Sequence, residues 1–142
     1  MRHLLPLIAL PLAAACMSGP PSPQAQAAAA DRQSEIDAEL AQELAGKVAG
    51  TPVSCISTSR VRSSKNVGDQ TLLYEVSANL VYRNDPVGGC SGLQYGRTLI
   101  TRTPSTQLCA GDIARVADLQ TGMETGSCAF SEWVPYRTAQ GG

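Results

Sequence analysis

The alternation of apolar and polar residues divides the chain into segments with different periods. Between residues 31 and 48 apolar side chains recur every four positions, at Ile36, Leu40 and Leu44. This is the spacing of one face of an α-helix, and Ser34 supplies a cap near its start. The pattern therefore predicts an amphipathic helix over residues 31–48.

From residue 51 onward apolar positions alternate with polar ones, which is the period of a half-buried strand. Turn-forming Asn, Asp, Pro and Gly residues interrupt these runs at intervals of about 8–12 residues, as in small β-barrels and β-sandwiches. We therefore expect a mainly β domain over residues 51–137, a barrel or sandwich of about 6–8 short strands, followed by a disordered tail at 138–142. The expected strands are Val53–Ser57, Arg60–Ser63, Thr71–Ser77, Leu80–Arg83, Arg97–Arg102, Thr106–Cys109, Ile113–Ala117 and Cys128–Tyr136.

The first segment has the features of an export signal. Arg2 precedes an apolar run that ends at Ala15 and is too short to span a bilayer. The small residues leading into Cys16 resemble a degenerate bacterial lipobox, in which the cysteine is lipidated and becomes the new N-terminus. We therefore expect residues 1–16 to be a lipoprotein signal with Cys16 as the lipidation site. Ordinary cleavage, after Ala15 or after residues 25–27, is the alternative.

Residues 17–30 are rich in Pro, Ala and Gln, carry no charge and offer little apolar surface to bury. We expect them to form a flexible tether. Met17 follows the cysteine, so the acidic residue that retains many lipoproteins in the inner membrane is missing. The expected location is the periplasmic side of the outer membrane, where the lipid is the membrane contact, with a soluble periplasmic or secreted protein as the alternative.

Five cysteines set the covalent architecture. Once Cys16 is assigned to lipid an even number remains, which suits two disulfides in an oxidising compartment and permits three pairings. We favour Cys55–Cys128 with Cys90–Cys109, because the first and last strands become neighbours where a sheet closes on itself. A zinc site is disfavoured because the cysteines come singly, without a C-x2-C pair, and we expect no cofactor.

Charge and composition narrow the function classes. The 142 residues contain 11 Lys and Arg against 12 Asp and Glu, and this net charge of −1 argues against a nucleic-acid partner. The single histidine, His3, lies in the expected signal. Its removal leaves no histidine for Ser-His-Asp or Cys-His catalysis or for a metal centre.

Four residues are weak candidates for a ligand site. Asp112 lies beside a glycine turn, Arg60 and Arg62 alternate onto one face of an expected strand, and Trp133 lies in a run of large side chains. Each also has a structural explanation: a turn cap for the aspartate, a solvated face for the arginines and the core for the tryptophan. Further basic residues extend the arginine surface, namely Lys65, Arg83, Arg97, Arg102 and Arg115.

Short motifs follow one another in order through the β domain. They are Cys55-Ile56, Arg60-Val61-Arg62, Asp69 to Tyr74, Tyr82-Arg83-Asn84, Cys90 to Leu93, Leu108 to Asp112, and Cys128 leading to Pro135-Tyr136. With the four ordered cysteines, this set resembles a family of small exported proteobacterial proteins of unknown function, over residues 53–137. Members commonly look like lipoproteins, which agrees with the lipobox interpretation. The family has no established activity, so the resemblance implies no catalytic residues.

We therefore expect a non-enzymatic, lipid-anchored envelope protein, a disulfide-stabilised binding or structural module for an unidentified envelope protein or glycan. The alternative is an envelope hydrolase that uses carboxylates alone, which requires two of them about 5–9.5 Å apart in a cleft. The carboxylates of the β domain are Asp69, Glu75, Asp85, Asp112, Asp118, Glu124 and Glu132.

Overall fold

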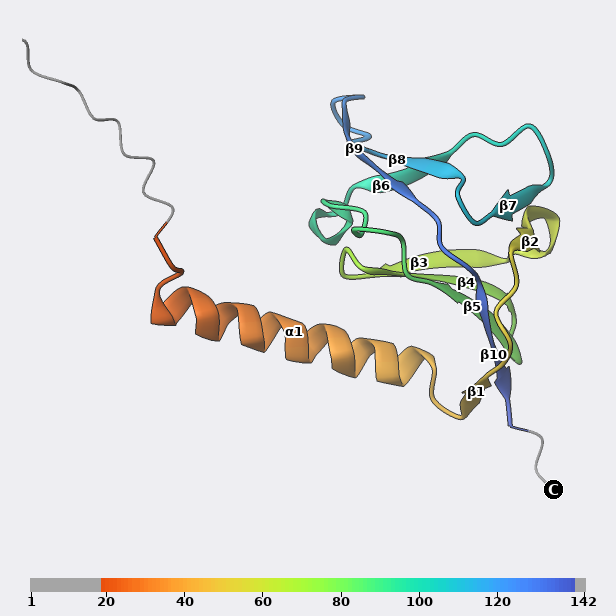
Figure 1. Cartoon of the computed structure of the whole chain (residues 1–142), viewed down its shortest axis with the longest axis horizontal. Coiled ribbons are helices and arrows are strands. Elements are labelled where there is room, and N and C mark those ends of the chain that lie inside the picture. The colour runs from red at the N-terminus through yellow and green to blue at the C-terminus, as the bar shows by residue number, and fades with distance from the viewer. Residues whose placement is uncertain (1–18, 140–142) are drawn as a thin grey trace, which may run out of the picture.

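Residues 19–139 are described by the computed structural model, in which one long helix precedes ten short strands (Figure 1). The mainly β fold expected from the sequence is confirmed. No helix in this part of the chain is long and apolar enough to span a bilayer. The elements are α1 (Pro23–Glu43), β1 (Lys47–Ala49), β2 (Cys55–Ser57), β3 (Ser63–Val67), β4 (Thr71–Ser77), β5 (Leu80–Asn84), β6 (Thr98–Thr101), β7 (Gln107–Cys109), β8 (Ile113–Ala117), β9 (Glu124–Ala129) and β10 (Val134–Thr138), with short 3-10 turns η1 (Thr58–Arg60) and η2 (Leu93–Tyr95).

The strands form three antiparallel sheets in a sandwich-like arrangement. The largest sheet has the order β1-β10-β5-β4-β3, a second has the order β6-β8-β9, and β2 pairs with β7. The described strands do not close into a barrel, so β3 and β6 are each the last strand of their sheet. These two sheet edges border the site described below.

The main core is built around three aromatic side chains. The ring of Tyr74 lies 5.0 Å from that of Trp133 and nearly perpendicular to it, and Phe130 lies 5.1 Å from the same indole. Strand alternation explains the arrangement, because Leu72 and Tyr74 of β4 face this core while Leu73 faces the opposite side of the sheet. The remaining buried members are Ile56, Cys90, Leu93, Leu108, Ala114, Val116 and Cys128.

Helix α1 covers part of the opposite face of the large sheet. Its apolar positions Ile36, Leu40 and Leu44 pack against a second buried cluster, which consists of Val67, Leu73 and Val81. The apolar residues that recur every four positions in the sequence therefore form the helix face that contacts the sheet.

The expected bounds of this helix were wrong at both ends. It begins at Pro23 because the Ser22 side chain accepts the N–H of Ala25 at 3.2 Å and a proline suits the first helical position. Residues 23–30, expected as part of a flexible tether, are thus helical. The helix ends at Glu43, and residues 47–49 pair with β10 instead. The expected signal of residues 1–16, with Cys16, and residues 140–142 lie outside the described residues, whereas Thr138, expected as the first residue of a disordered tail, ends β10.

The expected final strand, Cys128–Tyr136, is two strands in different sheets. The chain leaves β9 and joins β10 through residues 130–133. The fully buried Asn84 of β5 holds this passage, since its amide donates to the carbonyl of Ser131 at 2.7 Å and accepts the N–H of Ser131 at 3.2 Å. One polar side chain therefore satisfies the backbone where it changes sheets.

The disulfides pair differently from the expectation. Cys55 is bonded to Cys109, its cross-strand partner between β2 and β7, and Cys90 is bonded to Cys128 of β9. The nested pairing Cys55–Cys128 with Cys90–Cys109 is wrong because β2 pairs with β7 rather than closing onto the last strands. The two disulfides indicate an oxidising compartment.

Candidate functional site

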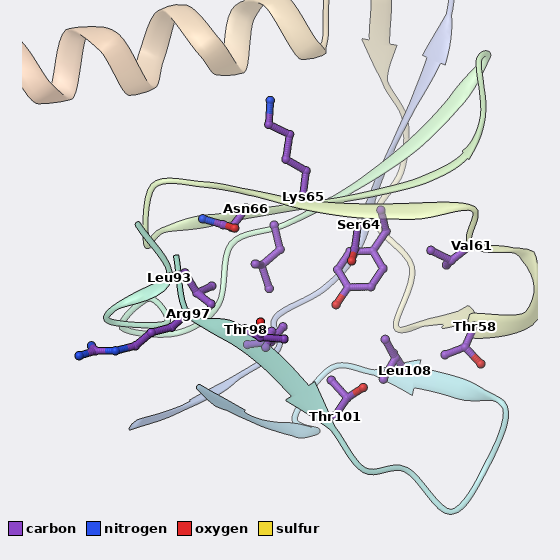
Figure 2. Close-up of a pocket in the computed structure, with 13 residues that line it drawn as sticks. Thr58, Val61, Ser64, Lys65, Asn66, Leu93, Arg97, Thr98, Thr101 and Leu108 are labelled. Atoms are coloured by element: carbon purple, nitrogen blue, oxygen red, sulfur yellow. The ribbon is translucent and has the colours of Figure 1, made fainter. Parts of the chain in front are cut away.

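A groove with a volume of about 430 Å³ opens between β3 of the large sheet and β6 of the three-stranded sheet (Figure 2). This volume lies within the range of ligand-binding clefts. We call it the β3–β6 groove. Its lining residues are Thr58, Val61, Ser64, Lys65, Asn66, Leu72, Tyr74, Leu93, Arg97, Thr98, Leu99, Thr101 and Leu108.

The floor of the groove is apolar and belongs to the main core. Leu72 and Tyr74 reach it from β4, Leu93 from η2 and Leu108 from β7. These side chains are held by the packing of the core, so the floor is formed before any ligand arrives. A ligand that places apolar groups here removes them from water without reorganising the protein.

Polar side chains border this floor. Ser64 comes from β3, Thr98 and Thr101 come from β6, and none of their hydroxyls bonds to another described residue. Each hydroxyl is therefore available as a donor and as an acceptor. Figure 2 shows that Lys65 points the other way, toward α1, where its Nζ lies 2.7 Å from Glu39 and from Glu43. Only the backbone side of this lysine faces the groove.

Tyr74 contributes a buried phenol to the lining. Burial raises the pKa of Tyr74 to about 12, so its hydroxyl keeps its proton throughout the physiological range. It therefore offers the groove a neutral donor and acceptor rather than a negative charge.

One end of the groove is fixed by Asp69, which lies in the turn between β3 and β4. Its carboxylate accepts the backbone N–H of Gly92 at 3.0 Å and that of Gln94 at 2.8 Å, and its carbonyl accepts the N–H of Cys90 at 2.7 Å. These bonds hold η2 and thereby place Leu93 at the groove. Sequence analysis included this aspartate among the carboxylates of the β domain and did not predict these contacts.

Arg97 lies beside that end, packed on Gly92. A Cβ added at this glycine would lie 2.5 Å from the guanidinium of Arg97, so a larger residue would displace the end of the arginine side chain, and the φ of +103° also favours glycine here. The pKa of Asp118 is lowered by the backbone N–H groups of Thr121 and Gln120 and by the charge of Arg97, yet the two side chains form no ion pair. In Figure 2 the Arg97 side chain extends outward from the end of the groove.

The basic residues singled out in the sequence fall into two groups. Three have acidic partners: Lys65 pairs with α1, Arg83 with Asp85 at 2.9 Å, and Arg115 with Glu124. The others form no ion pair within residues 19–139; one of them lines the groove, and the rest adjoin lining residues along the chain. Arg97 lines it, two flank the lining residue Val61 and one follows Thr101; the group consists of Arg60, Arg62, Arg97 and Arg102.

The four sequence candidates do not come together as one site. Asp112 accepts the N–H of Cys109 at 2.8 Å and so caps its own turn, and Trp133 is fully buried in the core. Arg60 and Arg62 do not alternate along a strand, because residues 58–60 form a 3-10 turn and the next strand begins at Ser63. Both are exposed, and they matter as neighbours of the groove.

The groove itself was missed by sequence analysis. Its lining comes from segments between residues 58 and 108 that are brought together only by the meeting of two sheets. The sequence signal that could have indicated it is the alternation of side-chain direction along β4, which places Leu72 and Tyr74 on one face.

Most carboxylates of the β domain have structural partners. Asp69, Asp112 and Asp118 accept backbone N–H groups of turns, and Glu75 accepts the hydroxyl of Ser63. Asp85 and Glu124 pair with arginines. None of the described residues that line the groove is acidic, and nowhere in residues 19–139 do three or more Cys, His, Asp or Glu side chains gather as a metal site.

Comparison of the chain with models of protein families, with curated proteins and with solved structures gave no match. The resemblance to a family of exported proteins therefore stays a prediction.

Proposed function

We propose that this chain is an exported binding module, held at the cell envelope by a lipid on Cys16, whose ligand occupies the β3–β6 groove. The observation that carries the proposal is the groove itself, which combines a preformed apolar floor with hydroxyls and an arginine, Arg97, that have no hydrogen-bond or ion-pair partner among the described residues. Burial on the floor supplies affinity, and the polar border supplies orientation.

Two observations support export. The disulfides are typical of an oxidising compartment, and the N-terminal sequence has the order of charge, apolar run and small residues found in export signals. Lipidation is supported by the cysteine count, because the four other cysteines are all bonded to one another. Cys16 is thus the one cysteine of the five left for another role.

A photo-crosslinking amino acid placed in the groove tests the binding role. We would replace Thr101, which lines the groove, and as a matched control Gln120, which is exposed in the turn between β8 and β9. Irradiation of intact cells should give adducts with the Thr101 variant that are missing from the control. Equal labelling at the two positions would contradict a ligand site in the groove.

Intact-mass measurement of the protein from membrane fractions tests the anchor. We expect a diacyl or triacyl modification on Cys16 and loss of anchoring in Cys16→Ser. A water-soluble product that begins near Ala28 would show ordinary signal cleavage and contradict the lipid anchor.

A further inference from the structure

Resting on the proposed function, we infer that the ligand of the β3–β6 groove is an acidic peptide segment in extended conformation, which adds as a strand to one of the two sheet edges that border the groove. The inference concerns the chemical class of the ligand. It follows from three features of the groove: its edges, its floor and its charge.

The groove is bordered by two terminal strands. In the strand orders, β3 has β4 as its neighbour and β6 has β8. Outside these ladders, residues 63–67 and 98–101 make no backbone hydrogen bond within the described chain. Alternate residues of an edge strand direct their N–H and C=O groups outward. Two rows of unpaired backbone groups therefore face a ligand that enters the groove.

Backbone groups of this kind are satisfied by another extended backbone. Strand addition to a sheet edge is an established mode of peptide recognition, in which main-chain hydrogen bonds give affinity and alternate side chains enter pockets. The apolar floor formed by Leu72, Leu93 and Leu108 would receive every second side chain of the added strand. A glycan or a lipid headgroup has no regular row of donors and acceptors to match these edges.

The charge around the groove selects an acidic segment. Arg97 stands at one end, and Arg60, Arg62 and Arg102 adjoin lining residues at Val61 and Thr101. These arginines form no ion pair with a described residue, and none of the described lining residues is acidic. Acidic side chains of a peptide would supply the missing partners, with charge-assisted hydrogen bonds at the guanidinium groups.

Fluorescence anisotropy with defined peptides tests the inference. The probe is a fluorescein-labelled peptide of about seven residues that alternates Val and Glu, long enough to cover a strand of β3 or β6 length. The first control replaces Glu with Lys. The second keeps every side chain but methylates alternate backbone nitrogens, which removes the donors needed for strand addition. We expect the unmodified Val–Glu peptide to bind at least about tenfold more tightly than either control.

Matched protein variants locate the binding. Arg97→Gln combined with Arg102→Gln should weaken the Val–Glu peptide by about tenfold. Arg137→Gln should leave it unchanged, because Arg137 is an exposed arginine on β10, which β5 and β4 separate from β3. On binding, hydrogen exchange should slow at backbone amides of residues 63–67 or 98–101. Equal binding of the methylated peptide, or unchanged exchange at both edges, would overturn strand addition.

The two proposals fail in different ways. If the Val–Glu peptide does not bind but the Thr101 crosslinker still gives adducts specific to the groove, the peptide inference is overturned and the binding module stands. If neither peptide binding nor groove-specific adducts are found, both are overturned.

Discussion

Asn84 shows how one buried polar side chain supports a change of sheet. It is fully buried, and it bonds to backbone groups of Ser131 and Glu132 that would otherwise be unsatisfied where the chain passes from β9 to β10. Removing such a side chain leaves donors and acceptors buried without partners, which is more costly than the loss of the bonds themselves.

Asn84→Ala should therefore lower the free energy of unfolding by about 2–3 kcal/mol. Asn79→Ala is the control, because Asn79 is exposed and its side chain accepts only the hydroxyl of Thr138. The control should change stability by no more than about 0.5 kcal/mol. Urea unfolding followed by Trp133 fluorescence measures both, and similar losses for the two variants would contradict the role given to Asn84.

Because of Tyr74, the free energy of unfolding should fall at alkaline pH. Its pKa is raised by burial from 10.0 to about 12 in the folded protein. Below about pH 10 both the folded and unfolded chains keep the proton, and the contribution of this group is fully present. Between about pH 10 and 12 the unfolded chain loses the proton first, so stability falls by about 3 kcal/mol in total.

Tyr74→Phe should remove the part of the stability loss at alkaline pH that comes from this phenol. We expect the difference in unfolding free energy between wild type and variant to be constant up to about pH 10 and to shift in favour of the variant by pH 12. Denaturant unfolding at a series of pH values measures it. A difference that does not change with pH would mean that this phenol is not protected by burial.

At the residue scale, the sequence predicted the environment of side chains that have partners close in the chain or that are large and apolar. The placement of Trp133 in the core and the turn cap at Asp112 belong to this group. Asn84 and Asp69 could not be predicted in the same way. Their partners lie 47 and 23 positions away, and only the tertiary fold brings them into contact.

At the scale of elements, α1 contacts the large sheet only through the C-terminal part of the helix. Ile36, Leu40 and Leu44 pack on the sheet, and Lys65 bonds to Glu39 and Glu43, which raises the pKa of the lysine. These exposed ion pairs contribute modestly because water and salt screen them. The docked part of the helix should therefore open more easily than the sheets.

Lys65→Glu should loosen this attachment by placing a third carboxylate beside two others. Hydrogen exchange of the amides around Leu40 should become about fivefold faster, with a smaller difference at high salt. Arg62→Glu makes the same change of charge at an exposed arginine without an ion pair, and it should leave exchange in α1 unchanged. Equal acceleration in both variants would assign the effect to net charge alone.

Strands and helices were predicted well where apolar residues mark a buried face, and poorly where the residues of the element are mostly polar or small. Thr71–Ser77 was expected with its observed bounds, because β4 lies between two cores and carries Leu72, Leu73 and Tyr74 in succession. Strand β3 was missed because four of its five residues, Ser63 to Asn66, are polar, as suits a strand that borders an open groove. The start of α1 was missed because the Ser22-Pro23 cap lies within a low-complexity run.

At the scale of the whole molecule, the disulfides join parts that the sheets leave separate. Cys55–Cys109 links the three-residue strands β2 and β7, and a two-stranded ribbon of this length is marginal without further support. Cys90–Cys128 ties the segment before η2 to β9 within the main core. The pairing depends on which strands are neighbours, and the expectation of sheet closure led the sequence interpretation to the wrong pair.

Non-reducing peptide mapping should find Cys55 linked to Cys109 and Cys90 linked to Cys128. The bridged cysteines are separated by 54 and 38 positions. The chain-entropy model gives about 4 kcal/mol for each bridge, although engineered examples often give less. Removing Cys90 and Cys128 as a pair to Ala should cost more than removing Cys55 and Cys109, because only the former pair is fully within the core. A Cys55–Cys128 peptide would contradict the described strand order.

Helix α1 makes the two faces of the large sheet different from each other. Residues 23–35 are exposed and form about 20 Å of helix. Figure 1 shows this part of α1 extending beyond the strands. The helix lies on one face of the large sheet, and the groove opens on the other. An anchor upstream of Pro23 would then hold the domain at a distance set by the length of this helix. Lengthening or shortening this helix would change that distance without altering the β3–β6 groove.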